Sequence, residues 1–180
     1  MYGYHISGNI FFVALIFFLS LFVAKSAYAS GRFVEKELVI LDSDMVEIYD
    51  DGMAMAMLAL SSKVELLGVS VVAGNTWVEE GTAFALRQLE GIGRAETIPV
   101  AMGVNHPLSG GRLANMKEER ELFGFGRDNW QGAGGYPRPE SWRAVYKNTY
   151  RLEPQSAPLG EHAADFIIEQ VKKYPGRVTI

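Results

Sequence analysis

The sequence has no cysteine, so no disulfide bond can stabilise the fold in any compartment. It also lacks a cluster of basic residues, and its 17 Lys and Arg against 21 Asp and Glu give a formal net charge of −4. A mildly acidic chain without a basic patch is unsuited to binding the phosphate backbone of a nucleic acid. Stability must therefore come from core packing and from any metal ion that the protein binds.

Two common ligand-binding loops are also missing. The chain has no glycine-rich run that ends in Gly-Lys-Ser/Thr at its acidic turn, which excludes a phosphate-binding loop of that type there. A calcium loop of the EF-hand type counted from Asp42 would need Gly at its sixth position and Glu at its twelfth. The sixth position is not Gly and the twelfth is Met53, so this loop is excluded as well.

Residues 1–29 are predicted to be a cleaved secretory signal peptide. An apolar segment covers Ile10–Ala24, and Ala27 and Ala29 then form an A-x-A cleavage pattern. No Lys or Arg precedes the apolar segment, so an uncleaved anchor is the alternative, although the segment is short for a membrane span. We expect cleavage after Ala29, a secreted or periplasmic location, and a mature domain of residues 30–180.

Four aspartates stand between an expected strand and an expected helix. Leu38–Leu41 is a short apolar run rich in branched side chains, which predicts a buried strand. Asp42 and Asp44 follow it, then Asp50 and Asp51, and then a run of strong helix formers. Carboxylates grouped in this way repel one another unless a cation lies among them. A hard cation bound by oxygen ligands is the best candidate.

A purely structural explanation is available for each acidic pair. Asp50 and Asp51 could cap the free amides of the following helix and suit its dipole. Asp42 and Asp44 could be ordinary turn residues at the end of a strand. The presence of both pairs on one strand-to-helix turn favours a binding site.

The rest of the mature chain alternates between strands and helices. Strands are expected at Val64–Ala73 and Ile98–Met102 and helices at Val78–Gly91 and Gly160–Lys173, with a further strand opening at Arg177–Ile180. This order predicts an α/β fold with an open, mainly parallel, Rossmann-like sheet flanked by helices. Residues 105–158 break the pattern, and their many aromatics among Gly and Pro predict an ordered insertion near the mouth of the site.

Topology brings several polar residues to one edge of this sheet. Ligands of such sheets bind beyond the carboxyl ends of the strands. Asp42 and Asp44 follow the first strand, Asn75 follows the second, and Asn105 and His106 follow the third. We therefore expect these residues to line one rim.

These residues give the chain a resemblance to the inosine/uridine-preferring nucleoside hydrolase family. The family's acidic motif is matched by Asp42-Ser43-Asp44 and Asp50-Asp51-Gly52, and its second motif by Val72-Ala73-Gly74-Asn75. The loop between the acidic pairs, Met45–Tyr49, is two residues longer than is usual in the family. The chain also ends where family members are about half complete, which implies a fold truncated at its C-terminus.

The resemblance implies hydrolysis of the N-glycosidic bond of ribonucleosides, such as inosine, another purine nucleoside or uridine, with release of base and ribose. A bound Ca²⁺ would hold the ribose diol and a water molecule. Asp44 would be the general base and a metal ligand, Asp51 a second ligand, and Asp42 a support for the metal cluster from behind. Asp50 would bind ribose hydroxyls, and Asn75 would position Asp44 or the substrate. Later family segments that complete the calcium and ribose sites are absent.

Two alternatives remain open at this point. A Mg²⁺-dependent phosphatase of the haloacid dehalogenase type also begins with a strand and Asp-x-Asp, with Asp42 as nucleophile and Asp44 as acid. It needs neither Asp50 and Asp51 nor Asn75. The chain could instead be an inactive fragment, or half of a split protein that needs a complementing C-terminal chain or a homo-oligomer. We expect the isolated mature product to be poorly soluble and essentially inactive.

Overall fold

The computed structural model describes residues 35–47, 49–107, 111–124 and 132–180. The expected signal peptide, residues 1–29, lies outside this part of the chain. Residues 36–180 form one compact unit by their contacts, separate from residues 1–35.

Four parallel strands form a single sheet in the spatial order β3-β2-β1-β4. This arrangement confirms the predicted α/β fold with a parallel sheet, because helices join β1 to its parallel neighbour β2 and β2 to its parallel neighbour β3. β1 and β2 pair so that Asp42 stands opposite Ser70. The strands are β1 (Glu37–Ser43), β2 (Val64–Val71), β3 (Val100–Met102) and β4 (Val178–Thr179).

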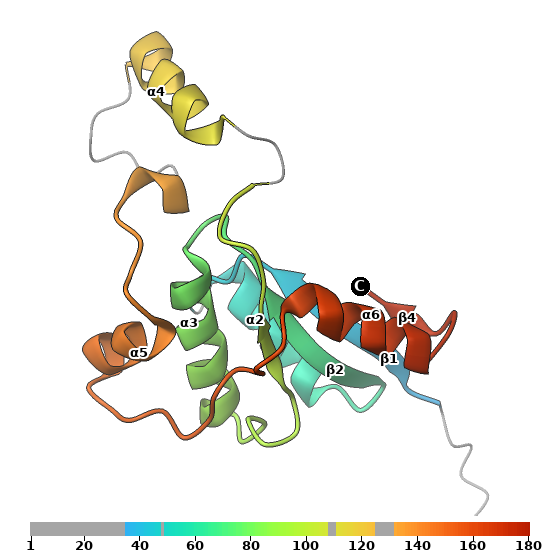
Figure 1. Cartoon of the computed structure of the whole chain (residues 1–180). Coiled ribbons are helices and arrows are strands. Elements are labelled where there is room, and N and C mark those ends of the chain that lie inside the picture. Colours follow the sequence, from blue (N-terminus) through green and yellow to red (C-terminus); the bar gives the residue numbers. More distant parts are fainter. Residues whose placement is uncertain (1–34, 48, 108–110, 125–131) are drawn as a thin grey trace, which may run out of the picture. The chain divides into compact units, whose positions relative to one another are not determined.

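Helices connect the strands, and two further helices lie within the insertion. α2 links β1 to β2 and α3 links β2 to β3, while α6 precedes β4 (Figure 1). In the described ranges, no helix has the length and apolar character needed to cross a membrane. The helices are α2 (Asp50–Leu60), α3 (Val78–Gly91), α4 (Arg112–Phe123), α5 (Trp142–Tyr150) and α6 (Ala163–Lys173), with a 3₁₀ turn η1 (Ala133–Gly135).

The core lies on both faces of the sheet. On one face, Val69 and Val71 of β2 pack with Met55 of α2, Leu86 of α3 and Tyr146 of α5. A smaller cluster on the other face joins β1 and β3 to α6; it contains Ile40, Ala101, Ala163 and Phe166. Burial of branched and aromatic side chains on both faces is what fixes the sheet between the two helical layers.

Helix α6 differs from the expectation. Its apolar residues Ala164, Ile168 and Val171 are exposed. Only Ala163 and Phe166 are fully buried. The reason is the short strand beside it, because β4 has two residues and offers little surface beyond β1. The helix also begins at Ala163 rather than Gly160, and the His162 side chain caps it.

Candidate active site

The first acidic residue lies inside β1 rather than after it. β1 continues through Ser43, so the alternation of a strand directs Asp42 and Ser43 to opposite faces of the sheet. Asp42 Oδ1 accepts a hydrogen bond of 2.5 Å from the hydroxyl of Ser70, its register partner on β2. Asp42 is thus held by the neighbouring strand, on the face away from Ser43.

Asp44 is held by the second motif. Its Oδ2 accepts a hydrogen bond of 2.7 Å from the backbone N–H of Asn75. Gly74 precedes Asn75 and lies so close that an added Cβ would be 2.3 Å from the same oxygen. The turn after β2 therefore needs glycine at this position, because any side chain would displace the Asp44 carboxylate.

Asp51 lies close to the other carboxylates of the turn. It sits in the first turn of α2 and is partly buried. Burial raises its pKa, and the negative charges of Asp44 and Asp50 raise it further, while the nearby Ser43 hydroxyl opposes the rise. Asp44, Asp50 and Asp51 therefore form one interacting acidic group at the carboxyl end of β1.

The acidic residues do not act as a conventional helix cap. The N-cap of α2 is Tyr49, and no side chain makes a capping hydrogen bond there. Asp50 and Asp51 occupy the first turn, where their charge suits the helix dipole. The structure thus leaves their carboxylate oxygens without the capping role that the structural alternative assigned to them.

The loop between the acidic pairs is fixed by α3 and the residues before it. The Thr76 hydroxyl donates to the Met45 carbonyl at 2.7 Å, and Gln88 Nε2 donates to the Glu47 carbonyl at 2.7 Å. The N-cap of α3 is Trp77, the residue after Thr76. The reciprocal contact at the start of α3 is made by Glu80, which accepts from the Trp77 N–H at 3.1 Å.

The donor set of this turn fits a hard divalent cation in its chemistry. Asp44, Asp50 and Asp51 supply carboxylate oxygens, and the buried Ser43 Oγ beside them has no hydrogen-bond partner at normal distance. Within the described ranges, however, no three Asp, Glu, His or Cys side chains are spaced as a ready-made metal centre. A cation here would need to draw the carboxylates closer or to add water and carbonyl ligands.

The other predicted rim residues are Asn105 and His106. Asn105, after β3, lies near Glu79 of α3, and His106 is exposed. Sequence reasoning missed Ser70 and the pairing of Glu79 with Arg138 at 2.5 Å. Ser70 was detectable as a polar residue in an apolar strand, but the pairing joins residues that are distant in sequence.

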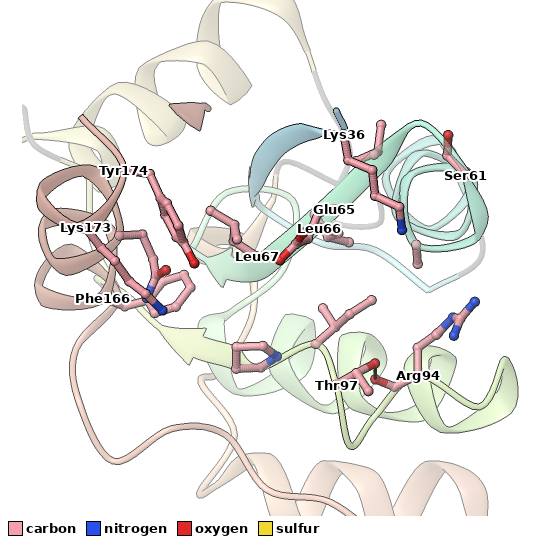
Figure 2. Close-up of a pocket in the computed structure, with 15 residues that line it drawn as sticks. Lys36, Ser61, Glu65, Leu66, Leu67, Arg94, Thr97, Phe166, Lys173 and Tyr174 are labelled. Carbon is pink, nitrogen blue, oxygen red and sulfur yellow. Dashed lines mark hydrogen bonds between the residues drawn. The ribbon is translucent and has the colours of Figure 1, made fainter. Parts of the chain in front are cut away.

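A separate cavity lies at the opposite edge of the sheet. It has a volume of about 480 Å³, and its lining includes Lys36 and Glu65 near the amino ends of β1 and β2, and Arg94 before β3 (Figure 2). None of the predicted site residues lines it. It is therefore not part of the acidic site.

The fold and the site together define an α/β protein with an aspartate cluster beyond the carboxyl end of a central parallel strand. The family model described as inosine-uridine preferring nucleoside hydrolase matches residues 39–180. The chain belongs to this family.

Plant proteins are among its relatives. A probable uridine nucleosidase 1 of Oryza sativa subsp. japonica is 31% identical over 84% of this chain and 39% of its own length. Uridine nucleosidase 1 of Arabidopsis thaliana is 32% identical over 80% of this chain and 36% of its own length. The solved plant nucleoside hydrolase PpNRh1 has a TM-score of 0.53 and 27% identity, covering 80% of this chain and 38% of that one. The chain thus spans less than two fifths of the length of these relatives.

Proposed function

We propose that this chain carries the cation- and ribose-binding part of a nucleoside hydrolase site that acts on N-glycosidic bonds. The main support for this proposal is the hydrogen bond from the Asn75 backbone amide to Asp44, which lies close to the partly buried Asp51. It joins the two family motifs, Asp-x-Asp with Asp-Asp and Gly-Asn, at one edge of the sheet. The phosphatase alternative assigns no role to Asp51 or Asn75, and the family match does not favour it.

Asp44 and Asp51 would hold the metal, with Asp42 supporting the cluster from the far face of β1. When bound, Ca²⁺ would supply positive charge that orients a ribose diol and acidifies a water molecule. Asp44 would accept a proton from a water molecule as that water attacks the anomeric carbon, while the N-glycosidic bond breaks and the base leaves and takes up a proton from solvent. The hydrogen bond from the Asn75 N–H would keep one Asp44 oxygen oriented for this role. Asp50, exposed at the start of α2, accepts hydrogen bonds from ribose hydroxyls.

The test is Ca²⁺-dependent binding of uridine and inosine to the purified mature chain, measured by calorimetry. Binding is expected with Ca²⁺ and not with EDTA, and Asp50→Asn is expected to weaken it at least tenfold, or ~1.4 kcal/mol. Asp165→Asn, an exposed aspartate in the first turn of α6, is the matched control and should bind normally. Binding that ignores both Ca²⁺ and Asp50 would contradict the proposal.

Product analysis separates this function from a phosphatase. Release of ribose and free base from uridine during prolonged incubation at stoichiometric protein would support the hydrolase. Release of phosphate from uridine monophosphate, sensitive to Asp42→Asn, would instead favour the phosphatase. The names of the plant relatives make uridine the first substrate to try.

We also propose export, with cleavage after Ala29. This proposal rests on the apolar segment and the A-x-A pattern alone. The N-terminal sequence of the protein recovered from secreted or periplasmic fractions should begin at Ser30. Recovery of the intact N-terminus in the membrane fraction would instead indicate an anchor.

A further inference from the structure

The late part of the insertion is tied to the turn that carries Asn75. We define the clamp segment as Gly132–Arg138. The Ala133 N–H donates to the Gly74 carbonyl at 2.9 Å, and the Trp77 indole N–H donates to the Tyr136 carbonyl at 3.1 Å. The rings of Trp77 and Tyr136 also pack edge to face, with centroids 6.5 Å apart. The clamp segment thus bonds to the chain on both sides of Asn75.

The first residue of the clamp segment, Gly132, packs closely against Gly74. Gly132 has a φ of 83°, and an added Cβ would lie 2.5 Å from the Gly74 carbonyl oxygen. Backbone therefore touches backbone, because no side chain intervenes. Displacement of the clamp segment would move Gly74, and with it the Asn75 N–H that donates to Asp44.

The far end of the clamp segment is held by a charged pair. The Arg138 guanidinium donates to Glu79 Oε1 through Nη2 at 2.5 Å and Nε at 3.1 Å. Glu79 is 5% exposed, so its carboxylate depends on this partner for charge compensation. Asn105 joins the pair when its amide is oriented to donate to Glu79 at 3.3 Å and accept from Arg138 at 2.6 Å. Tyr136 adds a hydrogen bond of 2.6 Å to Glu80.

We propose that Arg138 is a positioning residue for the acidic site. Through its pair with Glu79, Arg138 keeps the clamp segment against Gly74 and thereby keeps the Asn75 N–H on Asp44. The importance of this contact for catalysis rests on the proposed function. The positioning itself is a property of the metal-free protein and can be measured without turnover.

The first measurement is amide hydrogen exchange in the metal-free mature chain. Arg138→Gln should speed exchange of the Asn75 and Ala133 amides about tenfold, since it removes the partner of a buried carboxylate. Lys147→Gln is the matched control, because it also removes one positive charge and one ion pair of 2.5 Å, with Glu153. Lys147→Gln should leave the exchange rates of both amides unchanged. Arg138→Lys should exchange both amides more slowly than Arg138→Gln does.

Two outcomes of this measurement would overturn the proposal. One is exchange at Asn75 that is no faster in Arg138→Gln than in Lys147→Gln. The other is equal acceleration at Val69, whose N–H bonds to the Pro99 carbonyl within the sheet, because that would indicate general destabilisation. If Arg138→Gln does not fold, Tyr136→Phe removes the contact with Glu80 and should speed the same two amides.

The second measurement asks whether Arg138→Gln binds Ca²⁺ more tightly or more weakly than the parent chain. Loss of a nearby positive charge would by itself tighten cation binding, whereas a loosened Asp44 weakens it. We expect Arg138→Gln to bind Ca²⁺ at least threefold more weakly, with partial rescue in Arg138→Lys, and tighter binding would overturn the proposal. If the parent chain binds no Ca²⁺, the calcium part of the proposed function fails, and the exchange result alone decides on Arg138.

Discussion

At the residue scale, the site depends on the close approach of Gly74 to Asp44. A methyl group at position 74 would lie 2.3 Å from Asp44 Oδ2 and would force that carboxylate away from the Asn75 N–H. We expect Gly74→Ala to weaken Ca²⁺ binding at least tenfold, or ~1.4 kcal/mol, with the fold retained. Calorimetric titration measures this change.

Gly91→Ala is the control for that substitution. Gly91 ends α3, and an added Cβ there meets nothing within 4 Å. The change should leave Ca²⁺ binding intact. It should leave the free energy of unfolding equal or slightly higher, because alanine allows the unfolded chain fewer backbone conformations than glycine does. Equal effects of the two substitutions on Ca²⁺ binding would show that the contact with Asp44 is unimportant.

Asp51 should destabilise the metal-free protein at neutral pH. Its pKa in the fold is raised above the ordinary 3.8, by burial and by Asp44 and Asp50. Ionisation of Asp51 therefore costs more free energy in the folded than in the unfolded state. This loss of stability is absent below pH 3.8, grows between pH 3.8 and the folded pKa, and stays constant above the folded pKa. Asp51→Asn removes the penalty.

The expected result is a rise in the melting temperature in EDTA. At pH 7, Asp51→Asn should melt about 2 °C higher than the parent chain, and the difference should vanish near pH 3. Asp165→Asn should give no rise, because Asp165 lies in the first turn of α6 where its charge suits the dipole. A lower melting temperature for Asp51→Asn at pH 7 would contradict the raised pKa.

The sequence predicted which residues would meet at the site better than it predicted their contacts. Topology predicted that Asp44 and Asn75 would line one rim, and a hydrogen bond joins the Asn75 amide to Asp44. The fact that Asn75 acts through its backbone was not predictable from side-chain type. The pair of Glu79 with Arg138 was also hidden, because 59 residues separate them. A single sequence does not reveal which distant charges meet.

At the scale of elements, α3 organises the insertion through Glu90. Its carboxylate accepts hydrogen bonds from the hydroxyls of Tyr146 and Ser156 and from the N–H groups of Gln155 and Ser156. Burial opposes ionisation of Glu90, but these hydrogen bonds outweigh it, so its pKa lies below the ordinary 4.5. Burial and the contact with Glu90 raise the pKa of Tyr146 to about 12.

Tyr146→Phe should therefore destabilise the fold. It removes a buried donor to a charged group, which is worth about 2 kcal/mol in the free energy of unfolding. Tyr49→Phe is the control, because Tyr49 is 71% exposed and its loss of the hydroxyl should cost almost nothing. Denaturant unfolding measures both, and equal stability of the two variants would contradict the role given to Glu90.

The contribution of Glu90 should disappear in acid. A carboxylate with a lowered folded pKa stabilises the protein above its unfolded pKa of 4.5, and the stabilisation is lost as pH falls through the folded pKa. The parent chain should be more stable than Glu90→Gln at pH 7, with a gap that narrows below about pH 4. Unfolding curves at several pH values test this, and a gap that widens in acid would be the wrong sign.

Element types were predictable from the sequence, and their exact limits and partners were less so. Periodicity located the α3 helix at the residues observed, Val78–Gly91. It placed Asp42 after the first strand, whereas β1 includes it, because the hydrogen bond to Ser70 suits strand geometry. The helices α4 and α5 inside the insertion were not separated from the surrounding glycines and prolines.

At the scale of the whole molecule, α2 carries an exposed apolar stripe. Met53, Met57 and Leu60 lie on one side of this helix and are 53%, 70% and 56% exposed. Contiguous apolar surface promotes association in water. We expect the mature chain to self-associate as its concentration rises, and Met53→Gln with Met57→Gln to reduce this in light scattering.

Leu122→Gln is the control for that double variant. Leu122 is also exposed, at 77%, but lies on α4 instead of α2. It should leave the scattering near that of the parent chain. Equal relief by Leu122→Gln would show that general surface hydrophobicity, and not the α2 stripe, drives association.

In the proposed site, Asp44 and Asp51 share a divalent cation at the carboxyl end of β1. Calorimetric titration of the metal-free mature chain with Ca²⁺ tests this most directly, with Asp51→Asn and Asp165→Asn compared side by side. We expect one Ca²⁺ per chain, at least tenfold weaker binding in Asp51→Asn and unchanged binding in Asp165→Asn. Ca²⁺ binding that is equal in the parent chain and in Asp51→Asn would contradict it.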